Sequence, residues 1–451
     1  MVRVLIPSGA LGLNYDADAL QRGIAAKPDI IAIDGGSTDS GPSYLGRGVS
    51  KYARASTKLE WAGLMQARAQ AGVPLVIGTA GTCGADTAVD WMLDITREIA
   101  AEQGRPLKIA VLRSSQDGDL IAQAFDAGQV TPLANAPEVT SETIRSCSNI
   151  VALAGAEQIE AALQTGADVI IAGRTTDTAI IAALPLMHGC HSGGAWHGAK
   201  IGECGALCAT NPQSGVILID FDETGFTVTP LADGAHASPH TVSAHMLYEN
   251  SDPFILYERG GHLDVTGAEY VALDDTSVRV EGSKWVPSDR YTVKLEGARP
   301  AGFRTVIMAL LRDPHYVTNA QQWADDIVDK CRTKVSQRMD LSVDDFALEL
   351  RLIGHSASFG ALEARAAAPL EIGVIGIITA PSEAQAAEIG KLLNPYLLHH
   401  PLTQEEEQPT FAFLFSPPEM HQGQVYEFAL NHVLRLNDPM SAFKLEVIDL
   451  A

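Results

Sequence analysis

Residues 29–39 read Asp-Ile-Ile-Ala-Ile-Asp-Gly-Gly-Ser-Thr-Asp, an unbroken apolar run that ends in two glycines, two hydroxyl side chains and a carboxylate. Residues 168–177 repeat this arrangement as Asp-Val-Ile-Ile-Ala-Gly-Arg-Thr-Thr-Asp. Short apolar runs bounded by glycine and polar residues are typical of strands that are buried on both faces of a parallel sheet. Both segments therefore predict a buried strand that ends in a polar loop, and we call these two loops the echo loops.

Strand-like and helix-like stretches alternate on either side of the first echo loop. Apolar runs occur at 2–7, 74–77 and 107–112, and amphipathic stretches occur at 59–70 and 86–101. Strands separated by helices indicate βαβ units and a parallel sheet. We expect an N-terminal α/β, Rossmann-like domain over residues 1–210, with a ligand site beyond the carboxyl ends of its strands.

The sequence changes character after residue 210. Short, turn-bounded runs such as 216–221 and 226–230 predict antiparallel strands, while 321–342 and 383–393 predict helices. We therefore expect a mixed α+β domain over residues 211–385, and a C-terminal extension over 386–451 that packs on the core.

The composition restricts the partners that the chain can bind. Its 451 residues include 32 Lys and Arg against 55 Asp and Glu, which gives a formal net charge of −23. Nucleic acids and anionic membrane surfaces attract basic proteins, so neither is expected as a partner. No signal-peptide pattern and no run of about 18 apolar residues is found, and the six cysteines fit a reducing compartment. We expect a cytoplasmic protein, and a homo-oligomer because soluble metabolic enzymes are commonly symmetric assemblies.

The echo loops provide the first candidates for catalysis. Asp39 and Asp177 end the two loops, and a pair of carboxylates facing one pocket can act as general acid and base. With Asp34 they could also hold a divalent metal. The alternative is that both loops are ordinary strand-to-helix turns whose Ser, Thr and Asp side chains cap the next helix.

Substrate-binding candidates follow from the same loops and from a third one, residues 78–84. Backbone N–H groups in a glycine-rich loop before a helix can hold an anion, which makes Gly78, Gly81 and Thr82 candidates. Ser37, Thr38 and Arg174 on the echo loops are further candidates, since Arg binds carboxylates well. The third loop has neither the dinucleotide-binding nor the Walker A pattern, so NAD and ATP are not supported as cofactors.

Histidines gather between residues 188 and 245, where six of the 13 lie. His240 and His245 are candidates for acid or base because histidine titrates near neutrality. A hydrogen-bonded core or surface role is the alternative for each. The spacing of Cys204 and Cys208 fits one turn of a buried helix as well as a zinc site.

Three more basic residues and one carboxylate complete the candidate set. Lys200 lies three residues before Glu203, and the two would be neighbours on a helix. Lys294 shares one face of a predicted strand with Glu296, and Arg304 follows. Lys200, Lys294 and Arg304 could bind a substrate carboxylate and Glu203 could act as acid or base, although a surface ion pair would also explain Lys294.

Several motifs in a fixed order resemble the acyclic terpene utilisation (AtuA-like) family. They span about residues 1–310 and comprise Ile33–Pro42, Tyr44–Gly46, Ile77–Gly78, Ala172–Arg174, Gly202–Gly205, Ser243–Glu249 and Lys294–Ala298. The resemblance implies a role in bacterial catabolism of citronellol- and geraniol-type compounds or of other organic acids, with a hydratase or lyase acting on a branched acyl intermediate. It carries over no catalytic residues.

Residues and resemblance together predict a lyase that adds or removes water at a small or branched hydroxy acid or its acyl thioester. The acid and base would come from Asp39, Asp177, His240, His245 and Glu203, with an unidentified divalent metal as an optional cofactor. Two alternatives remain open. One is carbon–carbon cleavage of a 3-hydroxy-3-methylglutaryl-like thioester, and the other is a non-catalytic subunit that binds an acyl substrate for a partner.

Overall fold

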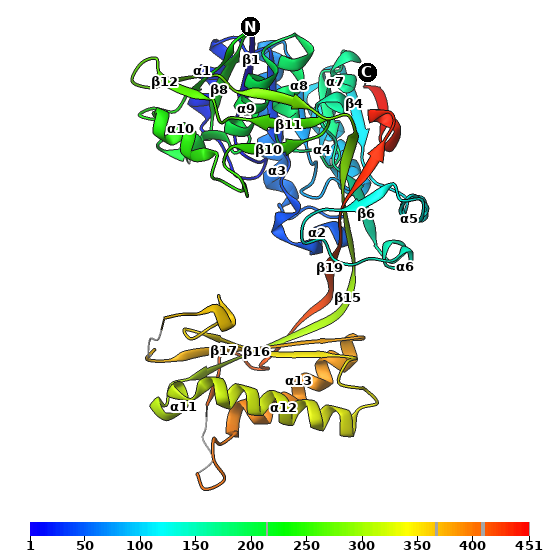
Figure 1. Cartoon of the computed structure of the whole chain (residues 1–451), viewed down its shortest axis with the longest axis vertical. Coiled ribbons are helices and arrows are strands. Elements are labelled where there is room, and N and C mark those ends of the chain that lie inside the picture. Colours follow the sequence, from blue (N-terminus) through cyan, green and yellow to red (C-terminus); the bar gives the residue numbers. More distant parts are fainter. Residues whose placement is uncertain (213–214, 366–368, 407–410, 451) are drawn as a thin grey trace. The chain divides into compact units, whose positions relative to one another are not determined.

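The computed structural model describes residues 1–212, 215–365, 369–406 and 411–450. The chain divides into two compact units, Met1–Arg299 with Phe428–Ala451, and Pro300–Glu427. Two long strands, β15 (Tyr291–Leu311) and β19 (Glu419–Leu436), run through the boundaries between the units (Figure 1). This division differs from the boundaries expected near 210 and 385, because strands formed after residue 210 join the first sheet and the last strand returns to it.

The first unit is built on a mixed sheet whose described strands follow the order β12-β13-β9-β8-β1-β2-β3-β7-β4-β20. The parallel strands are β1 (Val2–Ile6), β2 (Ile30–Asp34), β3 (Leu75–Gly78), β7 (Val169–Ala172) and β4 (Leu107–Arg113). The antiparallel strands are β8 (Ile217–Phe221), β9 (Gly225–Pro230), β12 (Glu269–Ala272), β13 (Val278–Glu281) and β20 (Lys444–Leu450). The α/β fold class predicted from the sequence is confirmed, and the apolar runs of the first half form the parallel strands.

Helices cover both faces of this sheet, because successive residues of each strand point to opposite sides. In β1, Val4 and Ile6 belong to one apolar core and Leu5 belongs to the other. The helices that contribute to the core around Leu5 are α1 (Ala17–Ala25), α3 (Arg54–Ala71) and α4 (Asp86–Gln103). The helices that contribute to the core around Val4 are α7 (Ala156–Gln164), α8 (Ala179–Met187) and α9 (Ser192–Gly202).

Shorter elements complete the first unit. They are α2 (Pro42–Arg47), α5 (Gly118–Asp126), β5 (Val130–Pro132), α6 (Ser141–Arg145), β6 (Asn149–Ala152), α10 (Pro239–His245), β10 (Ile255–Glu258), β11 (Gly261–Asp264), β14 (Lys284–Pro287) and the 3-10 turns η1 (Thr38–Ser40), η2 (Gly205–Cys208) and η5 (Pro439–Ala442). β6 pairs with the first part of β15, where Val151 lies opposite Glu296. This pairing fixes the backbone of Glu296 beside β6.

The second unit is an antiparallel sheet with helices packed against it. Its strands include β16 (Ala347–Ile353), β17 (Ile372–Ala380) and β18 (Ala412–Phe413), together with the second part of β15. Its helices are α11 (Pro314–Thr318), α12 (Ala320–Arg338) and α13 (Glu383–His399). In Figure 1, α12 and α13 lie on the same face of β16 and β17, and their apolar side chains share one core with those strands.

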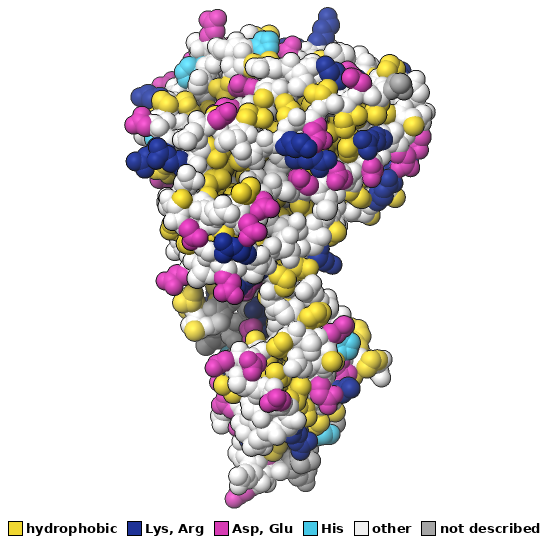
Figure 2. Space-filling view, turned by 90° about the vertical axis from the view of Figure 1, so that its right-hand side faces the viewer, with side chains coloured by type: hydrophobic (Ala, Val, Ile, Leu, Met, Phe, Trp, Pro, Cys, Tyr) yellow, Lys and Arg dark blue, Asp and Glu magenta, His cyan; other side chains and the backbone are white. Residues whose placement is uncertain are grey.

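The surface reflects the composition. On the face in Figure 2, Lys and Arg side chains are interspersed with Asp and Glu side chains, so this face offers no continuous basic area for a phosphate backbone. Within the described ranges, none of the helices combines the length and the hydropathy that a membrane span requires.

Candidate functional site

The carboxyl ends of β2, β3 and β7 meet at one edge of the sheet, and the loops that follow them pack on one another. The amide of Gly35 donates to the carbonyl of Gly78 at 2.7 Å, and the amide of Thr79 donates to the carbonyl of Gly173 at 2.9 Å. A Cβ atom on Gly35 would lie 2.6 Å from the Thr79 carbonyl oxygen, so only glycine permits this approach. The structure therefore brings the two echo loops together.

A cavity of about 570 Å³ opens beyond these strand ends. Its volume falls within the range of about 300–1,000 Å³ that is usual for small-molecule sites. Its acidic lining residues are Asp34, Asp39, Asp177, Glu203 and Glu249. Its large apolar lining residues are Leu13, Leu207 and Pro212. Among the described lining residues, the one Lys or Arg is Lys51, whose Nζ donates to Ser40 Oγ at 2.7 Å.

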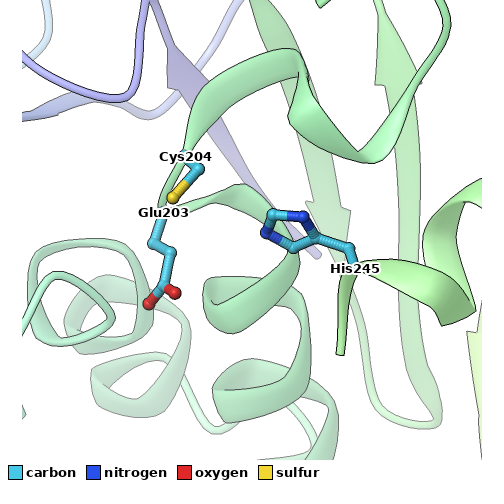
Figure 3. A group of neighbouring side chains, drawn as sticks. All are labelled: Glu203, Cys204 and His245. Carbon is cyan, nitrogen blue, oxygen red and sulfur yellow. The ribbon is translucent and has the colours of Figure 1, made fainter. Parts of the chain in front are cut away.

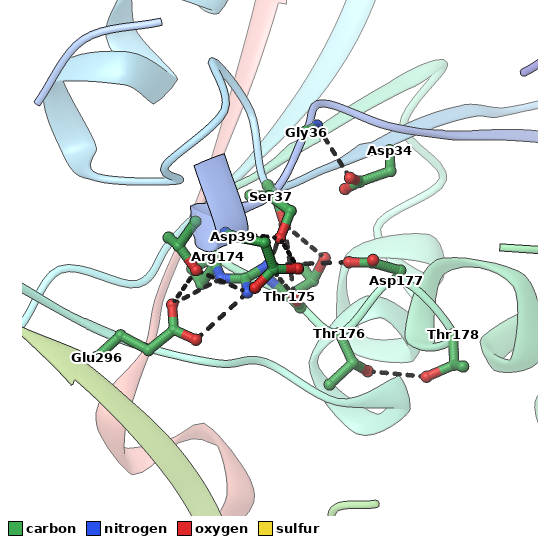
Figure 4. A network of polar contacts seen from close by, with 12 residues as sticks. Asp34, Gly36, Ser37, Asp39, Arg174, Thr175, Thr176, Asp177, Thr178 and Glu296 are labelled. Carbon is green, nitrogen blue, oxygen red and sulfur yellow. Dashed lines mark hydrogen bonds and ion pairs between the residues drawn. The ribbon is translucent and has the colours of Figure 1, made fainter. Parts of the chain in front are cut away.

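Asp34 is the last residue of β2 and is 5 % exposed. Its Oδ2 accepts from the amide of Gly36 at 2.9 Å (Figure 4). Its Oδ1 is buried and has no hydrogen-bond partner in the described part of the chain. Burial, and next the charge of Asp177, raise the pKa of Asp34 well above its ordinary value, so the protonated carboxyl is favoured.

Asp177 ends the second echo loop and has a side chain that is 32 % exposed. Burial raises its pKa to about 6, while the charge of Arg174, whose Nη1 lies 3.8 Å from Oδ1, opposes this shift and the charge of Asp39 adds to it. With a pKa of about 6, Asp177 is mostly ionised at neutral pH. The raised pKa of Asp34 favours its protonated form. Two neighbouring carboxyl groups in one cavity, both with raised pKa values, are suited to acid and base chemistry.

Arg174 cannot hold a substrate in this structure because the protein occupies all its donors. A guanidinium has five N–H groups. Arg174 donates to Glu296 Oε2 at 3.0 Å and Oε1 at 3.3 Å, and to Thr38 Oγ1, Thr79 Oγ1 and the Thr175 carbonyl, each at 3.2 Å (Figure 4). Thr38 in turn donates to Glu296 Oε2 at 2.8 Å. These two predicted substrate ligands therefore join the echo loops to β15.

The backbone N–H groups of the third loop, residues 78–84, are also used within the protein. The amides of Thr79, Ala80, Thr82, Cys83 and Gly84 all donate to backbone carbonyl oxygens of the chain, at 2.9–3.2 Å. An anion would need these groups unpaired. The expected anion cradle at 78–84 is thus a structural connector, in which Gly78 and Gly81 permit close packing. Its Thr82 has a further role, since Oγ1 accepts from the amide of Lys51 at 3.2 Å and so helps to place that residue on the cavity wall.

A second polar cluster lies after the end of α9, where α10 packs against η2. Lys200 is 4 % exposed, and its Nζ is ion-paired with Glu203 Oε1. Burial raises the pKa of Glu203 to about 8 although the charge of Lys200 opposes this. His245 on α10 stacks on Tyr248 with ring centroids 5.6 Å apart, and burial lowers its pKa to about 4. Figure 3 shows Glu203, Cys204 and His245 as neighbours.

Some predicted residues lie away from this cavity. His240 is exposed and does not line it. Lys294 ion-pairs with Glu296 at 3.0 Å and lines a separate cavity of about 390 Å³ in the first unit. Arg304 belongs to the second unit, where its Nε donates to Thr379 Oγ1 at 3.3 Å.

The predicted metal ligands Asp34, Asp39 and Asp177 do not form a compact ligand set. Among the residues described, the His, Cys, Asp and Glu side chains that come together as a ligand group are Glu203, Cys204 and His245, with one atom of each within 4.8 Å of the others. Ser37 donates to Asp39 Oδ2 at 2.7 Å, and both line the cavity. Asp39 is exposed, so it is poorly shielded from water.

Lys51, Tyr52 and Glu249 are among the cavity residues that sequence reasoning missed. Lys51 and Tyr52 follow no pattern that marks a site, and only the fold brings them beside the first echo loop. Glu249 lies in the segment 243–249 that resembles a family motif, so that segment was a usable signal.

Comparison with known protein families gives a match over most of the chain. Residues 57–410, most of the chain, match the family model described as "Acyclic terpene utilisation family protein AtuA". No curated protein and no solved structure matches the chain.

Proposed function

The chain belongs to the acyclic terpene utilisation family, and from this premise we propose that it is a lyase that adds or removes water at a branched hydroxy acid or its acyl thioester. The observation that carries this proposal is the pair Asp34 and Asp177 on the wall of one cavity of about 570 Å³. The family name indicates branched apolar skeletons, and Leu13 and Leu207 on the same wall suit such a chain. The reaction type rests on the carboxyl pair alone.

The reaction in the direction of water loss assigns one proton transfer to each carboxyl. The Asp177 carboxylate takes the proton from the carbon next to the substrate carbonyl. The bond between the next carbon and its hydroxyl oxygen then breaks, and Asp34 gives its proton to that oxygen. The products are an α,β-unsaturated acid or thioester and one water. Addition of water runs through the same steps in reverse, and it starts from the opposite protonation states, with the proton on Asp177 and the charge on Asp34.

Other residues position the substrate and the catalytic pair. Arg174 holds the second echo loop through Glu296, so the Asp177 carboxylate is presented from a fixed backbone. Lys51 supplies the positive charge on the wall that a substrate carboxylate or a thioester phosphate would contact. The other described charged residues of the wall are Asp and Glu, so a negatively charged group of the substrate is attracted to Lys51 alone.

The test is a screen of 2- and 3-hydroxy acids, free and as thioesters, for loss of water by mass spectrometry. With a substrate found, we expect Asp34→Asn and Asp177→Asn each to lower kcat by about 10² to 10⁴, the usual contribution of a general acid or base. Asp18→Asn on α1, which is exposed and away from the cavity, is the matched control and should keep wild-type kcat.

Three outcomes would overturn the proposal. Full activity of the Asp34→Asn/Asp177→Asn double variant removes the site assignment. Two carbon fragments in place of an unsaturated product identify carbon–carbon cleavage. Turnover that appears only with an added partner protein identifies an acyl-binding subunit.

A further inference from the structure

We propose that Glu203, Cys204 and His245 bind one Zn²⁺ at the wall of the cavity. Ligand atoms of all three side chains lie within 4.8 Å of one another (Figure 3). Zinc takes carboxylate oxygen, thiolate sulfur and imidazole nitrogen at about 2.0–2.3 Å in a tetrahedron, which separates the ligand atoms by about 3.3–3.8 Å. Side-chain movements of about 1 Å therefore close the site.

The ring of His245 carries an independent sign of a missing ligand. His245 is 6 % exposed, and its Nε2 is buried with no hydrogen-bond partner in the described residues. A buried nitrogen without a partner is unfavourable, so such an atom calls for an explanation. The backbone of Lys200 also lies beside this ring. Nε2 is the ring nitrogen that is buried without a partner. A backbone contact to one ring nitrogen while the other binds metal is the usual arrangement of zinc-bound histidine.

The backbone holds the other two ligands in place. Glu203 is the residue at the C-terminal end of α9, and Cys204 precedes η2 directly. A Cβ atom on Gly9 would lie 3.0 Å from the Cys204 backbone, so the turn that carries Cys204 is packed tightly against the first strand's loop. Two of the ligands are therefore adjacent on a fixed turn, and the third comes from another helix. Metal binding then restricts little backbone freedom.

The neighbouring Lys200 is compatible with this site. Its Nζ is paired with Glu203 Oε1, which leaves Oε2 for the metal. The Glu203 carboxylate and the Cys204 thiolate provide two negative charges, and Asp177 and Glu249 line the same cavity. This acidic surrounding offsets the Lys200 charge. A sulfur ligand with an imidazole favours zinc over magnesium or calcium, which prefer all-oxygen sites.

The fourth coordination position faces the cavity, since Glu203 and Cys204 both line it. Three protein ligands and an open position are typical of catalytic zinc. There the metal would polarise the carbonyl oxygen of the substrate and stabilise the charge that develops when Asp177 removes the neighbouring proton. This role rests on the proposed function, whereas the metal binding does not.

Metal content and absorption spectra test the binding without any substrate. The full chain is stripped with a chelator, dialysed against zinc and analysed for metal, with about one zinc per chain expected. Cys204→Ser and His245→Gln should each lower the zinc content at least tenfold. His240→Gln on the same helix and Cys147→Ser, whose thiol donates to the Thr143 carbonyl, are matched controls that should keep it.

The cobalt spectrum of the wild-type chain supplies a readout that does not depend on the folding of any variant. Co²⁺ bound to the wild-type chain should show the thiolate-to-metal charge-transfer band, and Cys204→Ser should lose it. A wild-type chain that holds under a tenth of a zinc, or one whose cobalt spectrum lacks the thiolate band, overturns the proposal. Water loss catalysed by the zinc-free chain would leave the function standing and remove the role of the metal in it.

Discussion

The Nε of Arg174 donates to Glu296 Oε2 at 3.0 Å, although the two residues are 122 positions apart in the chain. Their side chains are 7 % and 6 % exposed. The pair fastens the second echo loop to β15, and Thr38 adds the first echo loop through its hydrogen bond to the same carboxylate. The Asp177 carboxylate therefore keeps its place on the cavity wall through contacts made by residues that do not line the cavity.

Breaking this pair should destabilise the fold. Glu296→Gln leaves the Arg174 charge buried without its main partner, and loss of one member of a buried pair typically lowers the free energy of unfolding by about 3 to 5 kcal/mol. Lys294→Met, which removes a half-exposed partner of the same glutamate, should cost less than about 1 kcal/mol. Urea unfolding of both variants by circular dichroism makes the comparison. Equal, small losses would mean that Asp177 compensates for Glu296.

Asp177 should make stability depend on pH in a defined window. Its pKa rises from 3.8 to about 6 in the folded chain, so the folded state holds the proton more tightly than the unfolded one. Stability from this group is therefore lost as the pH rises from about 4 to about 6. Asp177→Asn should match wild type below pH 4 and exceed it above pH 6, by about 1 to 3 kcal/mol. Metal-free protein is compared across the pH range. A difference between the two chains that does not change with pH would contradict the assignment.

The local part of this structure could be predicted from the sequence. The apolar run at 29–33 ends at Asp34 as β2 does, because glycine after a buried run stops a strand. The structural role of Arg174 could not be predicted from the sequence, because its partner Glu296 lies on a strand far along the chain. The hydrogen bonds of the Thr79, Ala80 and Thr82 amides could not be predicted for the same reason, since their acceptors lie on the two echo loops and at the end of β7. The strand pattern that holds Lys294 and Glu296 was predicted correctly, but the continuation of β15 to Leu311 in the second unit was not.

Lys51 should set substrate affinity without taking part in the chemistry. It is exposed on the cavity wall and can meet a substrate carboxylate, but no hydrogen bond ties it to Asp34 or Asp177 in the described structure. We expect Lys51→Met to raise KM about tenfold, equal to about 1.4 kcal/mol, with kcat within twofold. The effect should shrink at high salt because exposed charges are screened. Lys391→Met, exposed in the second unit, is the control. A fall in kcat with KM unchanged would give Lys51 a part in the reaction itself.

Gly84 should tolerate no side chain, because the backbone of Arg174 occupies the space. A Cβ atom there would lie 2.2 Å from the Arg174 amide nitrogen. Gly104 has almost the same backbone, with φ +60° against +63°, and no described atom lies within 4 Å of its Cβ position. Both alanine variants carry the left-handed penalty of about 1 to 2 kcal/mol. Only Gly84→Ala adds a clash with backbone atoms, which cannot rotate away. This variant should therefore unfold at a markedly lower urea concentration, and the loop that carries Asp177 should be displaced. Equal urea midpoints for the two variants would show that the loop after β7 can shift away from the loop after β3, and Arg174 would then not be fixed as the structure has it.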